Sequence, residues 1–190
     1  VGTARNVQRI IAETNPDADF DVASNPEFLR EGAAISDFMR PDRVVLGVED
    51  ERAETLLREL YRPLNLIEAP IFVTGLESAE LIKYASNAFL ATKISFINEM
   101  SMLCEEVGAD VHAVSKGMGM DNRIGSKFLH PGPGYGGSCF PKDINAFMSY
   151  ADELGVDIPT IKGAWETNLN VRPERDWEKL EGRAIVRKNK

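Results

Sequence analysis

The sequence predicts an α/β fold in which the latter part of a parallel sheet is followed by one long helix and an all-α region. Two patterns carry this prediction. Short apolar runs alternate with helical segments up to about residue 75, and one helical pattern then continues from 76 to 107. Alternating strands and helices are typical of a doubly wound, Rossmann-like domain. The first 75 residues therefore read as the C-terminal part of such a domain.

In this first region we expect an opening helix capped by Thr3. Asn25 and Pro26 have the residue types that begin a helix, and Asp50 can cap another. Apolar runs predict the strands that these helices connect, at residues 20–23, 43–48 and 70–74.

The long helix expected at 76–107 carries apolar residues on nearly all of its sides, and Gly108 ends it. A helix of this kind is normally buried, so we expect a second copy of the chain to cover it in a homodimer. Shorter helices follow, capped by Asp110, starting near Pro141 and spanning about 160–170. We therefore divide the chain into residues 1–75, a central helical dimerisation and catalytic domain at 76–170, and a tail or the start of a further domain at 171–190.

Composition narrows the functional classes. The chain is 43% hydrophobic and 27% charged, as in soluble globular domains, and its net charge of −8 argues against a nucleic-acid partner. No apolar run approaches the ~20 residues of a membrane helix, and no signal peptide opens the chain. Its two cysteines form neither a disulfide framework nor a CxxC metal site. We expect a cytoplasmic protein with no membrane partner.

Three pairs of polar residues have a spacing that places them on one face of a helix: Glu27 with Glu31, Lys83 with Asn87, and Cys139 with Asp143. Paired glutamates are usually solvated and a helical lysine usually lies at the surface, so the first two pairs also have purely structural readings. Cys139 is harder to dismiss, because glycines and a helix start beside Lys142 favour the thiolate. Cys104, in the long helix, reads as an inert packed thiol.

Two other patterns are not predictive. Residues 132–137 match G-x-G-x-x-G formally, but no apolar strand precedes them, so we read no nucleotide fingerprint there. His112 and His130 lack the spacing of metal ligands, and we expect no metal site.

Three longer segments, residues 24–32, 80–89 and 128–143, together resemble the nucleotide-sugar 6-dehydrogenase family, and the resemblance covers roughly residues 1–170. Gly-Ser-Cys-Phe-Pro-Lys-Asp, at 137–143, is closer to the family's UDP-glucose branch than to its GDP-mannose branch. The UDP-N-acetylmannosamine branch typically has His-Cys-Ile-Pro instead.

The resemblance implies an NAD-dependent oxidation of UDP-glucose, from alcohol through aldehyde to carboxylate. By this resemblance Cys139 forms a thiohemiacetal and then a thioester, which holds the aldehyde covalently. Lys83 and Asn87 stabilise the oxyanion, Asp143 acts with a water as base, and Glu31 assists thioester hydrolysis.

The same resemblance implies residues that bind the nucleotide sugar: Glu27, Phe28, Leu29, Phe128, Leu129, His130, Gly134, Tyr135, Gly136 and Arg123, the last reaching a neighbouring subunit's substrate. Glu31 and Lys142 are placed next to NAD. Relative to the family, we expect the chain to lack the glycine turn for NAD and a second nucleotide-binding domain, and by itself to be inactive. Two alternatives stay open: a sister enzyme acting on another nucleotide sugar, and a non-catalytic helical dimerisation module.

Overall fold

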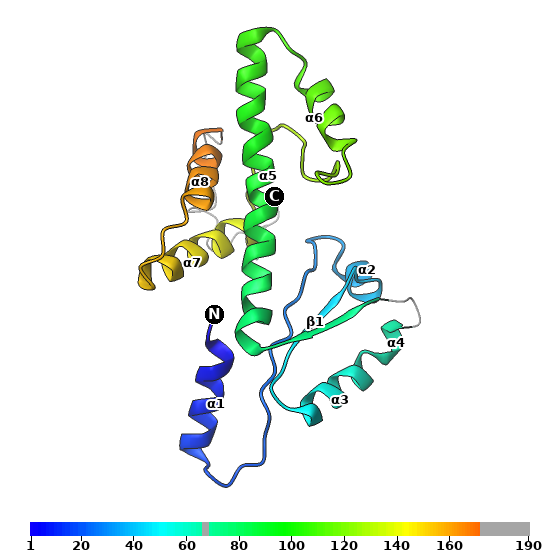
Figure 1. The fold of residues 1–190 in the computed structure, drawn as a ribbon, viewed down its shortest axis with the longest axis vertical. Coiled ribbons are helices and arrows are strands. Elements are labelled where there is room, and N and C mark those ends of the chain that lie inside the picture. Colours follow the sequence, from blue (N-terminus) through cyan, green and yellow to red (C-terminus); the bar gives the residue numbers. More distant parts are fainter. Residues whose placement is uncertain (66–68, 172–190) are drawn as a thin grey trace, which may run out of the picture. The chain divides into compact units, whose positions relative to one another are not determined.

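The computed structural model describes residues 1–65 and 69–171. The chain divides into two compact units, Val1–Ala85 and Ser86–Lys190, and the long helix α5 (Leu76–Val107) belongs to both. The other elements of the first unit are α1 (Thr3–Thr14), α2 (Ala34–Met39), β1 (Val44–Gly47), α3 (Glu51–Leu60), α4 (Arg62–Asn65) and β2 (Ile71–Thr74) (Figure 1). Those of the second are α6 (Val111–Gly119), α7 (Cys139–Glu153) and α8 (Pro159–Val171).

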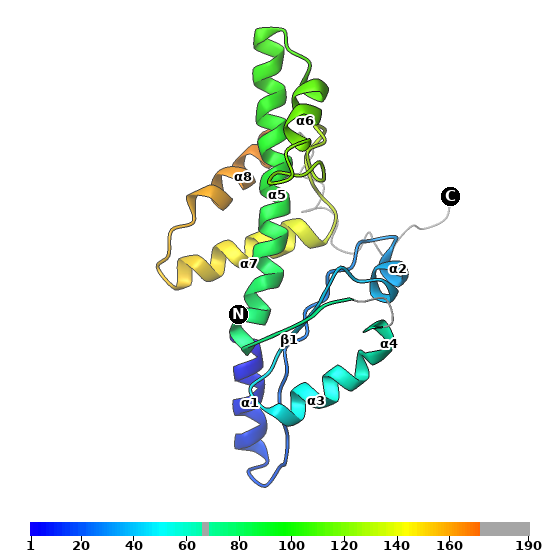
Figure 2. The same cartoon turned by 45° about the vertical axis from the view of Figure 1, so that its right-hand side comes forward.

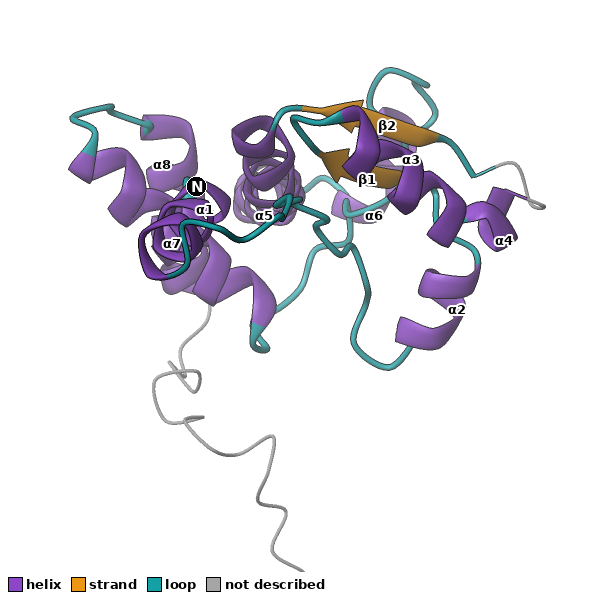
Figure 3. Cartoon of the chain, turned by 90° about the horizontal axis from the view of Figure 1, so that it is seen from below, coloured by secondary structure: helices purple, strands orange, loops and turns teal. Residues whose placement is uncertain are grey.

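The first unit is built around two parallel strands. β1 pairs with β2 in a register that places Val44 opposite Ile71 and Gly47 opposite Thr74. Figure 3 shows the strands side by side with α3 beside them. Val44 and Leu46 of β1 are buried against Leu57 of α3, which gives the sheet its apolar core. The predicted class, part of a Rossmann-like parallel sheet followed by a long helix and a helical region, is confirmed.

The strand predicted at 20–23 is wrong for the described chain. A strand needs a neighbour along its length, and here Ser24 alone forms a bridge, antiparallel to Gly47. The helix predicted at Asn25 and Pro26 is also wrong. The Asn25 side chain donates to the Val45 carbonyl at 2.9 Å and accepts from the Tyr61 hydroxyl, so it is not available to cap a helix.

The capping residues predicted for two other helices, α3 and α6, are confirmed. Asp50 accepts from the Arg52 N–H at 2.7 Å and begins α3, as predicted. Asp110 likewise begins α6 by accepting from the His112 N–H at 2.9 Å. The predicted cap of α1 is wrong, because Gly2 occupies the N-cap position.

In the second unit, α5 is covered on one side by α7 and α8 (Figure 2). Its small residues lie at this contact: Ala91 packs with Tyr135 and Ile144, and the Ser95 hydroxyl donates to the Ala164 carbonyl at 2.5 Å. Another side of α5 stays open in the single chain, because Phe89, Phe96 and Leu103 are 65%, 40% and 56% exposed. Its covering by a second copy of the chain stays a prediction.

Within 1–65 and 69–171, no helix combines the length and the hydrophobicity that crossing a bilayer requires. The tail or further domain predicted at 171–190 lies, from residue 172 on, outside the described residues.

Candidate active site

The predicted catalytic side chains form two groups. Lys83 belongs to the first unit, where it meets Glu27. Asn87 belongs to the second unit, where it meets Asp143 at the start of α7, which Cys139 begins. Lys83 and Asn87 themselves lie one turn apart along α5, as their spacing predicts.

The Lys83 ammonium is fixed by two kinds of contact. Its Nζ lies 2.8 Å from the Glu27 carboxylate and 5.7 Å from the centroid of the Phe28 ring. The Arg43 guanidinium lies 3.7 Å from the same centroid, so the ring interacts with two cations. The Lys83 side chain is only 18% exposed, and a largely desolvated ammonium held in this way can polarise an oxygen placed beside it.

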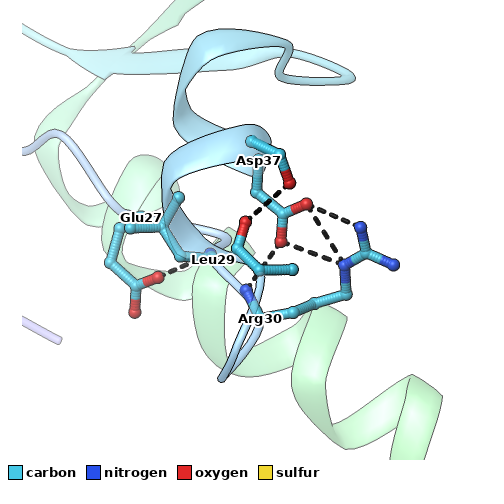
Figure 4. A network of polar contacts seen from close by, with 6 residues as sticks. Glu27, Leu29, Arg30 and Asp37 are labelled. Carbon is cyan, nitrogen blue, oxygen red and sulfur yellow. Dashed lines mark hydrogen bonds and ion pairs between the residues drawn. The ribbon is translucent and has the colours of Figure 1, made fainter.

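Glu27 opens a turn that polar contacts hold closed (Figure 4). Its second oxygen accepts from the Leu29 N–H at 2.7 Å. Asp37 accepts from the Arg30 backbone N–H at 2.8 Å and from its Nη2 at 2.6 Å. The Arg30 guanidinium, with this backbone N–H, lowers the pKa of Asp37 to about 2. Residues 25–30 form no helix, and Glu31 lies exposed in the turn that follows. The prediction that Glu27 and Glu31 share one helix face is therefore wrong.

Asp143 is the buried acid of the second group. Its Oδ2 accepts from the Asn87 amide at 2.6 Å, and its Oδ1 lies 3.3 Å from the Lys142 ammonium. The carboxylate is only 6% exposed, so the amide and the ammonium compensate a charge that water cannot reach well. Cys139 precedes Asp143 by one turn of α7, as the spacing predicts.

Cys139 is the first residue of α7 and is exposed, whereas Cys104 is buried in α5, as expected for a packed thiol. The contrast in reactivity stays a prediction. The turn that carries Cys139 is anchored beside it. Pro141 is buried, and the Phe140 ring lies 5.7 Å from the Tyr135 ring in an edge-on contact. The thiol is thus presented to solvent from a helix start that packing fixes in place.

The loop at 128–137 leads into this helix. Phe128 has a φ of 64°, an unusual left-handed conformation for a bulky residue. Leu129 is buried, and its carbonyl accepts from the Ser115 hydroxyl. The Gly132 N–H donates to Asn98 at 2.9 Å. Burial raises the pKa of the Tyr135 phenol well above its usual range.

The other predicted substrate residues lie in the same loop or before it. His130 is exposed, and Gly134 and Gly136 are partly buried. Arg123, just after α6, is 90% exposed and pairs with Asp121 of its own chain at 2.6 Å. Its reach to a neighbouring subunit stays a prediction.

Two groups of backbone N–H donors that could face a pyrophosphate already have acceptors within the chain. The Gly2 and Ala4 N–H groups at the start of α1 donate to the Glu80 carboxylate, the second at 2.8 Å. In the glycine-rich loop, the Gly132 and Tyr135 N–H groups donate to side chains of the chain itself. Donors committed in this way are not free for phosphate oxygens. In the described ranges no three His, Cys, Asp or Glu side chains gather as a metal site would require.

Two polar residues that the sequence did not single out organise these groups. Asp37 closes the turn that carries Glu31, and Asn168, in α8, binds the backbone of Tyr135. Their partners are set by tertiary folding, so spacing could not have found them. An asparagine within an otherwise packed helix was the available signal for Asn168.

The described residues thus combine a partial parallel sheet, a long helix, and an exposed helix-start cysteine with an amide–carboxylate pair one turn further on. Residues 1–65 match the NAD binding domain of the UDP-glucose/GDP-mannose dehydrogenase family, and residues 77–170 match its central domain. The chain belongs to this family.

Relatives support the same assignment. The chain is 54% identical over 188 residues to the UDP-glucose 6-dehydrogenase of Rhizobium meliloti, a match that covers 98% of the chain and 42% of the relative. A UDP-glucose dehydrogenase structure from Pyrobaculum islandicum has a TM-score of 0.84 and 46% identity, over 88% of this chain and 38% of that one. A GDP-mannose dehydrogenase structure from Pseudomonas aeruginosa has a TM-score of 0.61 and 36% identity, over 89% and 39%. The chain thus spans less than half the length of these relatives.

Proposed function

We propose that the protein to which this chain belongs oxidises UDP-glucose to UDP-glucuronate with NAD as the electron acceptor. The observation that carries the proposal is the Cys139 environment: an exposed thiol whose helix also holds Asp143 against Asn87 at 2.6 Å. The higher identity to UDP-glucose enzymes than to the GDP-mannose enzyme supports the choice of sugar.

The chemistry of each side chain fits a distinct role. Cys139 is the nucleophile that attacks the aldehyde carbon, which forms a C–S bond and leaves an oxyanion. The Lys83 ammonium and the Asn87 amide are donors suited to that oxyanion. Asp143 acts with an ordered water as the base. Its buried carboxylate suits this role because Asn87 and Lys142 hold it in place. Glu31 assists the attack of water on the thioester.

The sugar nucleotide is bound, in this proposal, by the turn around Glu27 and the loop that leads to Cys139: Glu27, Phe28, Leu29, Phe128, Leu129, His130, Gly134, Tyr135, Gly136 and Arg123. Glu31 and Lys142 lie nearest to NAD. Because the N–H donors at the start of α1 and in the loop already have acceptors, we assign no hydride-transfer step to the described residues.

The exposed side of α5 supports a homodimer. Phe89, Phe96 and Leu103 recur at intervals of seven residues, the spacing of a helix–helix seam. Phe96→Asp is expected to convert a dimer to a monomer in light scattering at micromolar concentration. Leu154→Asp, at an exposed apolar residue after α7, is the matched control and should leave the dimer intact. A monomeric original chain contradicts the proposal.

The activity is tested by grafting. The chain replaces the corresponding segment of the Rhizobium meliloti enzyme, and NADH formation is followed with UDP-glucose, GDP-mannose and UDP-N-acetylmannosamine. We expect turnover with UDP-glucose that Cys139→Ser abolishes and Cys104→Ser leaves unchanged. A soluble chimera that prefers another sugar nucleotide favours the sister enzyme. Turnover that survives Cys139→Ser contradicts the proposed nucleophile.

We further propose that the 190-residue chain by itself neither binds NAD tightly nor turns over UDP-glucose, because its candidate N–H donors are already committed. Calorimetric titration with NAD tests this, and micromolar affinity contradicts it.

A further inference from the structure

Asn168 of α8 makes an unusual double contact with the loop that precedes Cys139. Its side chain is fully buried, at 0% exposure. Its Oδ1 accepts from the Tyr135 N–H at 2.7 Å, and its Nδ2 donates to the Tyr135 carbonyl at 3.0 Å. One side chain therefore satisfies both backbone groups of a buried loop residue, as a neighbouring strand would.

Gly134 is shaped to this contact. Its φ is +80°, and a Cβ built on it would lie 2.4 Å from Asn168 Oδ1 and 3.1 Å from Val171 Cγ2. A side chain at this position would therefore be strained by its backbone and would collide with the amide. The close fit between the loop and α8 therefore requires a glycine at 134.

The contact continues toward the thiol. The Tyr135 ring lies 6.3 Å from the Trp165 ring of α8 and 5.7 Å from the ring of Phe140, the residue after Cys139. Movement of Tyr135 would therefore release the packing that fixes the first turn of α7. We propose that Asn168 is a positioning residue, which sets the location of Cys139 by holding the Tyr135 backbone. The inference rests on the proposed function in assigning the nucleophile's role to Cys139.

Hydrogen exchange and thiol alkylation test this in the 190-residue chain. Asn168→Ala removes both bonds, so exchange in segment 132–138 should become about tenfold faster, with a changed pH profile of Cys139 alkylation. The matched control is Thr167→Val on the same helix. Thr167 is also buried, but its hydroxyl donates to Glu99 at 2.6 Å and not to the loop. This variant should leave both readouts at 132–139 unchanged.

Asn168→Asp separates positioning from a general structural role. A neutral carboxyl can accept from the Tyr135 N–H and donate to its carbonyl, whereas a carboxylate can only accept. Relative to the original chain at each pH, protection of 132–138 should be lost near neutral pH and recover as the pH is lowered. This variant decides the question if Asn168→Ala does not fold.

Three outcomes overturn the inference: unchanged exchange at 132–138 in both variants, an increase spread equally over α5, α7 and α8, or no recovery of Asn168→Asp at low pH. Neither measurement requires turnover. The positioning role of Asn168 can therefore be refuted while the proposed UDP-glucose oxidation stands, and the reverse also holds.

Discussion

Removing the amide that faces the buried acid should destabilise the second unit measurably. In Asn87→Leu, Asp143 loses the donor at 2.6 Å and keeps the Lys142 ammonium at 3.3 Å. Losing a hydrogen bond to a buried charged group costs about 1.5–3 kcal/mol. For a chain of this size, 1 kcal/mol corresponds to about 2–4 °C in melting temperature, so a decrease of about 3–12 °C is expected.

The unfolding of this unit can be followed by the fluorescence of Trp165, whose ring packs near Tyr135, in a Trp177→Phe background. Asn145→Leu is the matched control: Asn145 lies on α7, as Asp143 does, and donates to the Pro141 carbonyl at 2.8 Å, but it is exposed, and its loss should cost less than about 1 kcal/mol.

The double variant Asn87→Leu/Asp143→Leu completes the cycle. It should be less destabilised than the sum of the two single variants, because no buried charge is left without its partner. Additive effects, or an Asn87→Leu variant as stable as the original chain, would refute the role given to this pair.

Three further outcomes are expected. The Arg30 guanidinium lowers the pKa of Asp37 from 3.8 to about 2, so its stabilising effect is complete above about pH 5 and is lost as the pH falls through 2. The difference in melting temperature between the original chain and Asp37→Asn should therefore shrink between about pH 5 and pH 2, and a constant difference contradicts this. Glu80→Ala should speed hydrogen exchange in the first turn of α1 and lower the free energy of unfolding by about 1 kcal/mol, because the Ala4 N–H loses its acceptor. Unchanged exchange would contradict this capping role of Glu80. Alkylation at neutral pH followed by peptide mapping should label Cys139 before Cys104, and equal labelling in the folded chain rejects the reactivity contrast.

Features with a local cause were predictable from the sequence. Asp50 and Asp110 begin α3 and α6 because each carboxylate reaches an N–H two residues ahead. The bounds of α5 were predicted because helix periodicity and Gly108 mark them. Motif spacing likewise placed Cys139 and Asp143 on one helix.

Features set by distant partners were not predictable. Asn25 has the residue type of a helix cap, but its side chain is bound to Val45 and Tyr61, and no helix begins there. Asn168 lies 33 residues from the loop residue it binds, and no local pattern marks the pair.

The most direct test of the proposed function is to trap the covalent intermediate. In the chimera with the Rhizobium meliloti enzyme, Glu31→Gln should slow hydrolysis of the thioester, so that UDP-glucose and NAD leave an acyl group on the enzyme. Mass spectrometry of peptides from an acid-quenched reaction should then find this group on Cys139 and none on Cys104. An active chimera that carries the acyl group on another residue, or that forms no adduct in this variant, contradicts the account.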